Sequence, residues 1–325
     1  MCMNILIPGG AGFVGLNIVS YWFKKYPKYT FHLVDNKSLD ELPFLAPYLE
    51  SGRAYYHELD LRNKKETREL FETIQPDIVI NAIEAARKKD FLEIHVFTTE
   101  NLLEAAKAVA VKQFIHLSCG AIYGYNPQTA GKTEGHRLVN ELDALLPSSP
   151  QNASKAAADL LVWSYSQRYG VPITTLRVAS LFGPFQSIDR FIPLMITHAL
   201  QNQSFPISSS GADIRDILHI EDFVDALDVI VNSTSAIGEI YNISAGVRVK
   251  NKEIADIIIT LLDRSSSLMF VSDDVKPEFA GLDPTKFINS FNWEAKRTPE
   301  IHESLSETVQ WYKDNSDWWK TDDHV

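Results

Sequence analysis

The feature that most limits the fold is a glycine-rich turn near the start of the chain. A short apolar segment at residues 4–7 runs into Pro8-Gly9-Gly10-Ala11-Gly12-Phe13-Val14-Gly15, and a segment of helical period follows. Glycines at positions 9, 12 and 15 allow a tight turn, let backbone N–H groups approach a pyrophosphate, and let the helix pack closely on the strand. Such a strand–turn–helix unit is typical of a parallel α/β sheet.

Short apolar segments alternate with segments of helical period through the first half of the chain. Strands are predicted at residues 4–7, 31–34, 55–59, 78–80, 114–117 and 173–176, and helices at 13–25, 64–74, 91–109 and 154–169. Because crossovers between parallel strands are right-handed, this order predicts an α/β fold with a Rossmann-type doubly wound parallel sheet, whose ligands bind at the carboxyl ends of the strands.

The pattern changes after Arg177, where helices are predicted at residues 191–200, 220–231, 252–262 and 300–312, joined by long loops. We therefore predict a dinucleotide-binding domain over residues 1–177 and a smaller, mostly helical C-terminal substrate domain over 178–325. Some segments of the second half are expected to return to the first domain.

Asp35 ends the second predicted strand, about 20 residues after the glycine turn. A carboxylate at this place hydrogen-bonds the adenosine ribose and repels a 2′-phosphate, so the pattern predicts NAD(H) rather than NADP(H). Asn36 is neutral and leaves that preference unchanged. The alternative is a glycine turn without a ligand and an acidic residue that ends a strand by coincidence.

Charge and residue counts exclude several other functions. The chain has 31 basic and 42 acidic residues, a formal net charge of −11, which disfavours nucleic acid and anionic membranes as partners. Its two cysteines and nine scattered histidines show no disulfide or metal-site spacing, so we predict no metal. No signal peptide or membrane span is recognisable, and we expect a cytoplasmic protein.

With these residues in place, the chain resembles the extended short-chain dehydrogenase/reductase family, of the nucleotide-sugar epimerase and 4,6-dehydratase type. The resemblance covers nearly the full length and rests on the glycine turn, Asp60-Leu61, Asn101 with Leu102-Leu103-Glu104-Ala105-Ala106, Ser118 to Tyr123-Gly124, Ser154-Lys155, Arg177 with Gly183-Pro184, Arg215-Asp216, and Asn242. It implies enzymes that modify the sugar of a nucleotide-diphosphate sugar with the help of NAD(H).

The resemblance also assigns roles to residues of this chain. Cofactor binding falls to Gly9, Gly12, Phe13, Val14, Gly15, Asp35, Asn36, Asp60, Leu61 and Lys155. Asp60 and Leu61 are expected beside the adenine, and Lys155 on the nicotinamide ribose. The substrate would be bound by Ser180, Arg215 and Tyr123, with Arg215 on the diphosphate. Relatives form homodimers through the helices that correspond to residues 91–109 and 154–169, so a homodimer is expected.

Catalysis is where the sequence departs from the family. Family members pass hydride from a sugar carbon to the nicotinamide while a tyrosine four residues before the lysine takes the hydroxyl proton. Here that place holds Gln151, whose amide can neither accept nor release a proton as a general acid or base near neutral pH. Cys119 stands where the family has Ser or Thr, and Lys155 could lower its thiol pKa from about 8.5. The catalytic candidates are therefore Lys155, Cys119, Gln151 and Ser118, with Cys119 either an acid/base or a buried filler beside Ser118.

Other residues leave alternatives open. Glu84 could act as a base, although pairing with Arg87 or Lys88 is favoured, and Tyr123, Tyr125, Glu134 or His136 could supply a proton. Relatives that dehydrate carry an Asp-Glu pair where this chain has Gly120-Ala121, which favours epimerisation or 4-oxidation over 4,6-dehydration. Two functions are expected: an enzyme that transfers hydride at a ring carbon, C4 being favoured, or a catalytically inactive regulatory protein that binds NAD(H) and a sugar nucleotide.

Overall fold

The computed structural model describes residues 2–85, 90–124, 138–208, 213–262, 268–271 and 281–320. They form two compact units. Unit 1 comprises Met1–Ile122, Ser149–Arg177 and Leu227–Tyr241, and unit 2 comprises Tyr123–Ser148, Val178–Ala226 and Asn242–Val325. No helix in these described ranges is long and apolar enough to cross a membrane.

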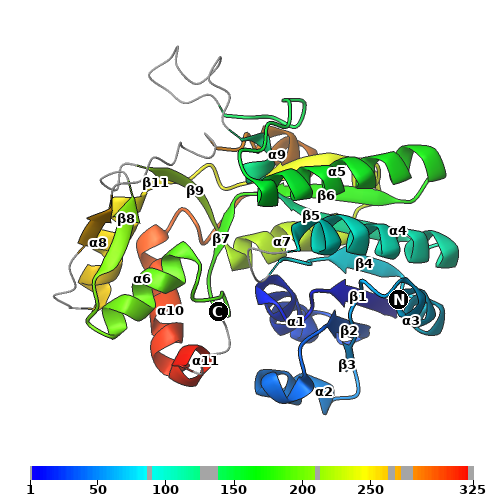
Figure 1. The fold of residues 1–325 in the computed structure, drawn as a ribbon, viewed down its shortest axis with the longest axis horizontal. Coiled ribbons are helices and arrows are strands. Elements are labelled where there is room, and N and C mark those ends of the chain that lie inside the picture. Colours follow the sequence, from blue (N-terminus) through cyan, green and yellow to red (C-terminus); the bar gives the residue numbers. More distant parts are fainter. Residues whose placement is uncertain are drawn as a thin grey trace. The chain divides into compact units, whose positions relative to one another are not determined.

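Unit 1 is built on a seven-stranded sheet in the order β10-β6-β5-β4-β1-β2-β3 (Figure 1). The strands are β1 (Met3–Pro8), β2 (Tyr29–Asp35), β3 (Ala54–Glu58), β4 (Ile78–Asn81), β5 (Gln113–Cys119), β6 (Ile173–Val178) and β10 (Ile240–Ile243). The neighbouring strands β3 and β2, β2 and β1, β1 and β4, and β4 and β5 all pair in parallel. The predicted doubly wound parallel sheet is confirmed, and its order reverses at β1, where such sheets bind ligands.

The helices of unit 1 cover this sheet. They are α1 (Phe13–Lys25), α2 (Ala46–Leu49), α3 (Lys64–Ile74), α4 (Thr98–Val109) and α5 (Pro150–Tyr169), with short 3₁₀ turns at Leu39–Glu41, Pro43–Leu45, Gly120–Tyr123 and Thr234–Ala236. Helices α3, α4 and α5 lie side by side over one face, where Leu6, Phe71, Leu102 and Phe114 are fully buried (Figure 1). The central strands β4 and β6 are buried along their whole length, on both faces of the sheet, which explains why they are mostly apolar.

One predicted helix is divided. Residues 91–109 were expected to form a single helix, but Leu92–Phe97 forms a π-helical turn that leads into α4. A π-helical turn holds one extra residue and re-aims the side chains around it, and such turns are frequent at functional sites. Here it carries His95, which is 4% exposed.

The described part of unit 2 combines two small sheets with several helices. The sheets pair β11 (Arg248–Lys250), β9 (Ile214–His219) and β7 (Ser180–Phe182), and, separately, β12 (Leu268–Val271) with β8 (Phe205–Ser208). The helices are α6 (Phe191–Leu200), α8 (Asn251–Leu262), α9 (Thr285–Phe291), α10 (Ile301–Asp314), α11 (Ser316–Lys320) and the first part of α7 (Ile220–Val231), whose residues from Leu227 onward belong to unit 1. Helices α6, α8 and α10 pack around an apolar cluster that includes Met195, Ile254 and Leu305. The small sheets were not predicted, because their strands are as short as three residues.

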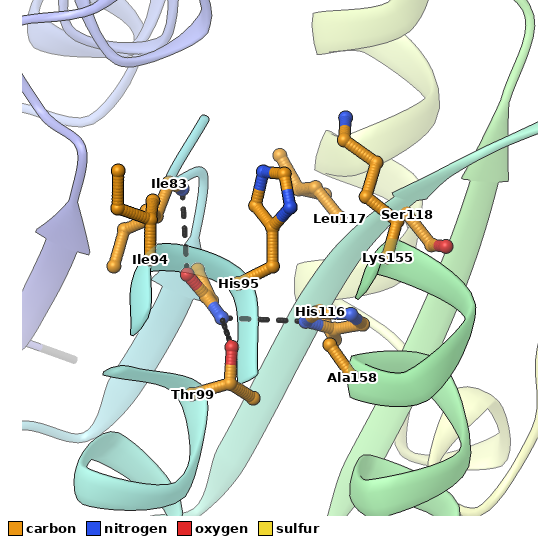
Figure 2. Close-up of a pocket in the computed structure, with 10 residues that line it drawn as sticks. Ile83, Ile94, His95, Thr99, His116, Leu117, Ser118, Lys155 and Ala158 are labelled. Atoms are coloured by element: carbon orange, nitrogen blue, oxygen red, sulfur yellow. Dashed lines mark hydrogen bonds between the residues drawn. The ribbon is translucent and has the colours of Figure 1, made fainter. Parts of the chain in front are cut away.

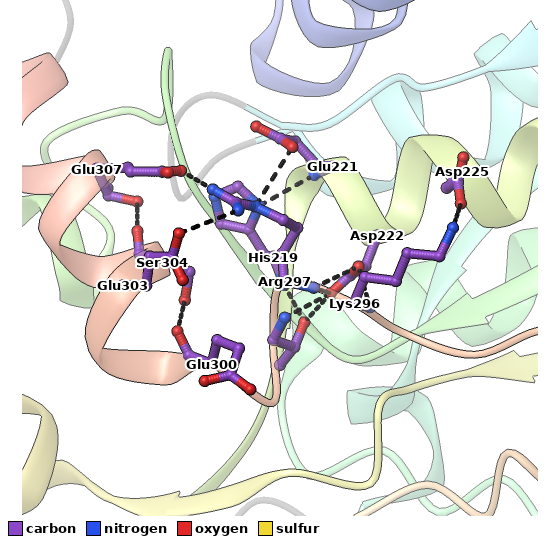
Figure 3. A network of polar contacts seen from close by, with 12 residues as sticks. His219, Glu221, Asp222, Asp225, Lys296, Arg297, Glu300, Glu303, Ser304 and Glu307 are labelled. Atoms are coloured by element: carbon purple, nitrogen blue, oxygen red, sulfur yellow. Dashed lines mark hydrogen bonds and ion pairs between the residues drawn. The ribbon is translucent and has the colours of Figure 1, made fainter.

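A polar network in unit 2 serves the fold rather than a ligand (Figure 3). The buried carboxylate of Asp222 accepts backbone N–H groups of Lys296, Arg297 and Thr298, at 2.8, 2.9 and 2.6 Å. Arg297 also lies 3.5 Å from the Glu221 carboxylate. Because every oxygen of Asp222 is used in this way, the network fastens the segment before α10 to the start of α7.

Candidate functional site

The glycine turn has no room for side chains. Gly9 has a φ of +76°, and a Cβ added there would lie 2.7 Å from the Ala82 carbonyl oxygen. A Cβ on Gly15 would lie 2.5 Å from the Gly10 carbonyl oxygen. Gly12 caps α1 without a side-chain hydrogen bond, so the N-cap residue leaves the first N–H groups of the helix, at Phe13 and Val14, available to a ligand. An uncapped helix N-terminus beside a tight glycine turn is a site for phosphate.

Acidic residues flank this turn. Asp35 ends β2, and its carboxylate accepts the N–H groups of Ala11, at 3.2 Å, and of Asn36, at 2.9 Å. Burial raises the pKa of Asp35, and Lys37 and these N–H groups offset part of the effect. Asp60, just after β3, is held by Arg62, which keeps the pKa of the Asp60 carboxyl below its ordinary value. Leu61 is buried, and Asn36 is exposed.

A pocket opens at the carboxyl ends of β4 and β5, and we call it the sheet-end pocket (Figure 2). It is lined by Asn81, Ile83, Ile94, His95, Thr99, His116, Leu117, Ser118, Lys155 and Ala158. These residues come from β4, the π-helical turn, α4, β5 and α5, all within unit 1. The pocket therefore lies at the edge of the sheet where the fold places ligands.

A buried polar layer forms the floor of the sheet-end pocket. The Asn81 amide donates to the Thr99 hydroxyl at 3.2 Å and to Nδ1 of His116 at 3.3 Å, and its oxygen accepts the N–H of Ile83 at 3.3 Å (Figure 2). Burial lowers the pKa of His116 to about 4, so this imidazole is neutral at pH 7. Thr99 and His116 were not predicted from the sequence as site residues. The usable signal was the alternation of His116 with Ser118 along one face of β5.

Lys155 points into the pocket from the second turn of α5, which Ser149 caps by accepting the N–H of Asn152 at 3.1 Å. Its side chain is 16% exposed, and its Nζ forms an ion pair with Oε2 of Glu84. Gln151 lies one turn earlier and donates its amide to Oε1 of Glu84 at 3.3 Å. The structure thus brings together Gln151 and Lys155, which the sequence had paired, and adds Glu84 as the group that both contact.

Ser118 and Cys119 end β5 with different surroundings. The Ser118 hydroxyl is buried and has no hydrogen-bond partner among the residues that the structure describes. Cys119 is half-buried, and burial raises the pKa of its thiol, while Lys155 offsets only part of that effect. The Cys119 thiol therefore keeps its proton at neutral pH, which favours the buried filler over the acid/base among the two expected roles.

The predicted substrate residues belong to unit 2. Tyr123 is 2% exposed, and its hydroxyl donates to Oδ1 of Asn242 at 2.9 Å. Arg215 is half-buried, with its Nε donating to Asn251 at 2.8 Å and its guanidinium 4.2 Å from the centre of the Phe191 ring. Ser180 begins β7 and is exposed. Tyr125, Glu134, His136, Arg87 and Lys88 lie outside the described residues.

The sequence of the chain can now be placed among known proteins. Residues 5–244 match the profile of the NAD dependent epimerase/dehydratase family. The chain belongs to this family. The suspected resemblance is confirmed, and so is NAD as the cofactor, at the level of the family. No group of three His, Cys, Asp or Glu residues placed to hold a metal ion is found in the described part of the chain.

Relatives that match the chain in sequence include 4,6-dehydratases. The chain is 30% identical to the dTDP-glucose 4,6-dehydratase of Salmonella typhimurium over 97% of its own length and 94% of that protein. It is 28% identical to a trifunctional UDP-glucose 4,6-dehydratase/epimerase/reductase of Arabidopsis thaliana, of which it spans only 48%. Hydride chemistry on a nucleotide sugar is thus the general class of the family, with dehydration at least as well represented as epimerisation.

Solved structures of family members agree in fold over almost the whole chain. The crystal structure of dTDP-glucose 4,6-dehydratase from Bacillus anthracis in complex with NAD has a TM-score of 0.86 at 31% identity, and covers 98% of this chain and 99% of that one. DesIV, the corresponding enzyme of Streptomyces venezuelae, with NAD and TYD bound, has a TM-score of 0.87 at 26% identity, with the same coverage. UDP-glucuronic acid 4-epimerase from Bacillus cereus, at 22% identity, shares the fold.

The residues described in unit 1 fit the family's cofactor. The closely packed glycine turn and the uncapped α1 provide N–H groups for a pyrophosphate, and Asp35 stands at the end of β2. The buried Ser118 hydroxyl lacks a hydrogen-bond partner among the described residues. A buried polar group without a partner lowers the stability of the fold by about 1–3 kcal/mol, and a hydrogen bond to a ligand would remove that cost.

Proposed function

We propose that this protein is an NAD-dependent enzyme that oxidises a ring hydroxyl of a nucleotide-diphosphate sugar, with C4 the favoured carbon. The observation that carries the proposal is that Lys155 and the unpartnered Ser118 hydroxyl line one pocket at the carboxyl end of the sheet. An ammonium group and a hydroxyl donor are what a reacting alkoxide or keto oxygen needs for stabilisation. The relatives' names support the substrate class.

Each residue then has a role that follows from its chemistry. Gly9, Gly12, Phe13, Val14 and Gly15 would hold the pyrophosphate. Asp35 would accept from the ribose, beside Asn36, and Asp60 and Leu61 would border the adenine. Lys155 would orient the nicotinamide ribose, and Ser118 would donate to the reacting oxygen. Bound NAD⁺ supplies the hydride acceptor.

The substrate diphosphate is assigned to unit 2. Arg215 keeps its charge when desolvated, and its planar guanidinium matches phosphate oxygens. Its contacts with Asn251 and Phe191 hold the side chain in one orientation. Ser180 is exposed and available as a donor, whereas Tyr123, with its hydroxyl on Asn242, would support the site rather than form new hydrogen bonds.

The net outcome after oxidation divides the alternatives. The relatives at about 30% identity are 4,6-dehydratases, which puts dehydration at least level with epimerisation. Against dehydration, Gly120 and Ala121 have no carboxyl group at the place where dehydrating relatives carry Asp-Glu. Product analysis separates the outcomes, because dehydration gives a 4-keto-6-deoxy sugar and epimerisation returns a sugar of unchanged mass.

A second candidate is a binding protein that retains the cofactor and sugar-nucleotide sites without turnover. Two observations favour it. The Gln151 amide does not act as an acid or base near neutral pH, and burial raises the pKa of the Cys119 thiol. The deciding experiment uses the purified protein. Absorbance and fluorescence determine whether NADH is bound, and the protein is then incubated with UDP-, dTDP-, GDP- and CDP-sugars. Product formed with any of them supports the enzyme; binding of a sugar nucleotide without product or cofactor reduction across the panel supports the binding protein.

The assembly we propose is a homodimer through residues 91–109 and 154–169. Apolar side chains on these segments are exposed: Leu92 by 55%, Phe97 by 52%, Leu160 by 59% and Trp163 by 44%. Several large apolar groups on one pair of helices mark an interaction surface more often than a solvated one. Light scattering should give twice the chain mass of 36.7 kDa for the wild type and a monomer for Trp163→Glu.

A further inference from the structure

Glu84 lies in unit 1, on a segment that passes the glycine turn and reaches Lys155. It follows β4 by three residues, on a segment that runs past the glycine turn, since a Cβ on Gly9 would strike the Ala82 carbonyl. Its carboxylate reaches Lys155 through Oε2 and Gln151 through Oε1. The Glu84 side chain is 40% exposed, so these two contacts orient the carboxylate without enclosing it.

Two described groups near Lys155 are poor proton acceptors, because Gln151 carries an amide and the Cys119 thiol stays protonated. His95 lies close to Glu84, with Nε2 3.7 Å from Oε1. The Ser154 hydroxyl donates to the Gln151 carbonyl at 2.8 Å, so Nδ1 of His95 must donate to Ser154, also at 2.8 Å.

The N–H of Ala85 reaches Nε2 of His95 at 3.4 Å, so both ring nitrogens of His95 are engaged by neighbouring groups. The ammonium of Lys155 is in direct contact with the Glu84 carboxylate.

We propose that Glu84 takes the place of the missing tyrosine and accepts the proton of the sugar hydroxyl; this inference rests on the proposed function. The O–H and C–H bonds of the ring carbinol break and a C=O bond forms. The proton passes to the Glu84 carboxylate, and the hydride passes to the nicotinamide acceptor. The reverse step returns the proton from Glu84 to the oxygen.

The ion pair makes this acceptor responsive to the cofactor. While Lys155 contacts Glu84, the carboxylate is stabilised in its charged form and binds a proton weakly. When Lys155 turns to the nicotinamide ribose, Glu84 loses the contact with this ammonium and becomes a stronger base, with Gln151 still holding its other oxygen. The basicity of Glu84 therefore rises when the cofactor is in place.

The central test is Glu84→Gln, which keeps the shape of the side chain and removes its basicity. General acid–base catalysis contributes roughly 10²–10⁴-fold, so kcat should fall by at least about 100-fold while the Kd for NAD⁺ changes by less than about threefold. Glu69→Gln is the matched control, an exposed glutamate on α3 that also pairs with a lysine, Lys65, and should leave both values unchanged. Adding Gln151→Tyr to Glu84→Gln should restore part of the rate, because it supplies a phenol four residues before Lys155.

A second measurement needs no cofactor. Lys155 should react severalfold faster with an amine reagent such as trinitrobenzenesulfonate in the Glu84→Gln variant, as followed by peptide mass spectrometry, because an amine without its carboxylate partner loses its proton more readily. Unchanged labelling would contradict the pair and overturn the inference.

The outcomes distinguish a failure of the role of Glu84 from a failure of the proposed function. An active wild type whose Glu84→Gln variant keeps more than about a third of the rate overturns the role of Glu84 alone. A Glu84→Gln variant that loses NAD⁺ affinity in step with its rate makes Glu84 a cofactor ligand and also overturns it. A wild type that forms no product with any sugar nucleotide overturns the proposed function, and the proton-accepting role with it.

Discussion

The buried ion pair between Arg177 and Asp159 offers the sharpest test of how unit 1 is held together. Asp159 lies on α5, one turn beyond Lys155, and its carboxylate accepts Nε and Nη2 of Arg177 at 3.1 and 2.8 Å. The two side chains are 1% and 5% exposed. Asp159→Ala leaves the guanidinium buried without its carboxylate, which costs about 3–5 kcal/mol. At about 2–4 °C per kcal/mol for a domain of this size, the melting temperature should fall by about 6–20 °C.

The control for this prediction is an exposed ion pair of similar length. Arg68 and Glu72 on α3 are 2.7 Å apart but 68% and 49% exposed, so Glu72→Ala should cost no more than about 0.5 kcal/mol. The double variant Asp159→Leu/Arg177→Met should recover most of the loss, because it removes both charges together. Urea denaturation of the three variants measures these free energies of unfolding. A loss of less than about 1 kcal/mol for Asp159→Ala would refute the argument from burial.

Three further outcomes follow from single positions. Gly15→Ala should weaken NAD⁺ binding by about 10–100-fold in calorimetry, since its Cβ must push the turn open, whereas Gly170→Ala, with open space around it, should leave NAD⁺ binding unchanged. Iodoacetamide should alkylate Cys119 at pH 7.5 at least about tenfold more slowly than the exposed Cys2; equal rates would contradict its raised pKa. The folded pKa of His116, about 4, lies below its value of 6.5 in a free chain, so between these values the unfolded state binds the extra proton. The free energy of unfolding should therefore fall as the pH drops from 6.5 towards 4, with a shallower slope in His116→Gln; parallel slopes would refute this.

The main sheet was predictable because each of its central strands is covered on both faces and therefore reads as an apolar run. The bounds of α1 and α3 agree with the predicted 13–25 and 64–74. The seventh strand, β10, was missed because it is four residues long and returns from the second half of the chain. The π-helical turn was missed because one extra residue does not disturb a helical pattern enough to be seen.

The candidate site was predicted in its parts but not in its contacts. Lys155 and Ser118 were named, and both line the sheet-end pocket. The partner of Lys155 was not foreseen, because Glu84 is 71 residues away along the chain and has nearer cations in sequence. Likewise, the type of residue at Cys119 allowed either a reactive thiol or a filler, and only burial, which depends on tertiary packing, decides between them.

The division of unit 1 into three stretches of chain limits how this protein can be taken apart. A fragment that stops at Arg177 lacks Leu227–Tyr241 and the whole of β10, the neighbour of β6 at the edge of the sheet. The outer backbone groups of β6 would then be unpaired and open to another chain, so such a fragment should aggregate. Because both units are assembled from interleaved stretches, neither can be exchanged as one block by recombination, and a change of substrate unit in this fold must come from substitutions and loop insertions.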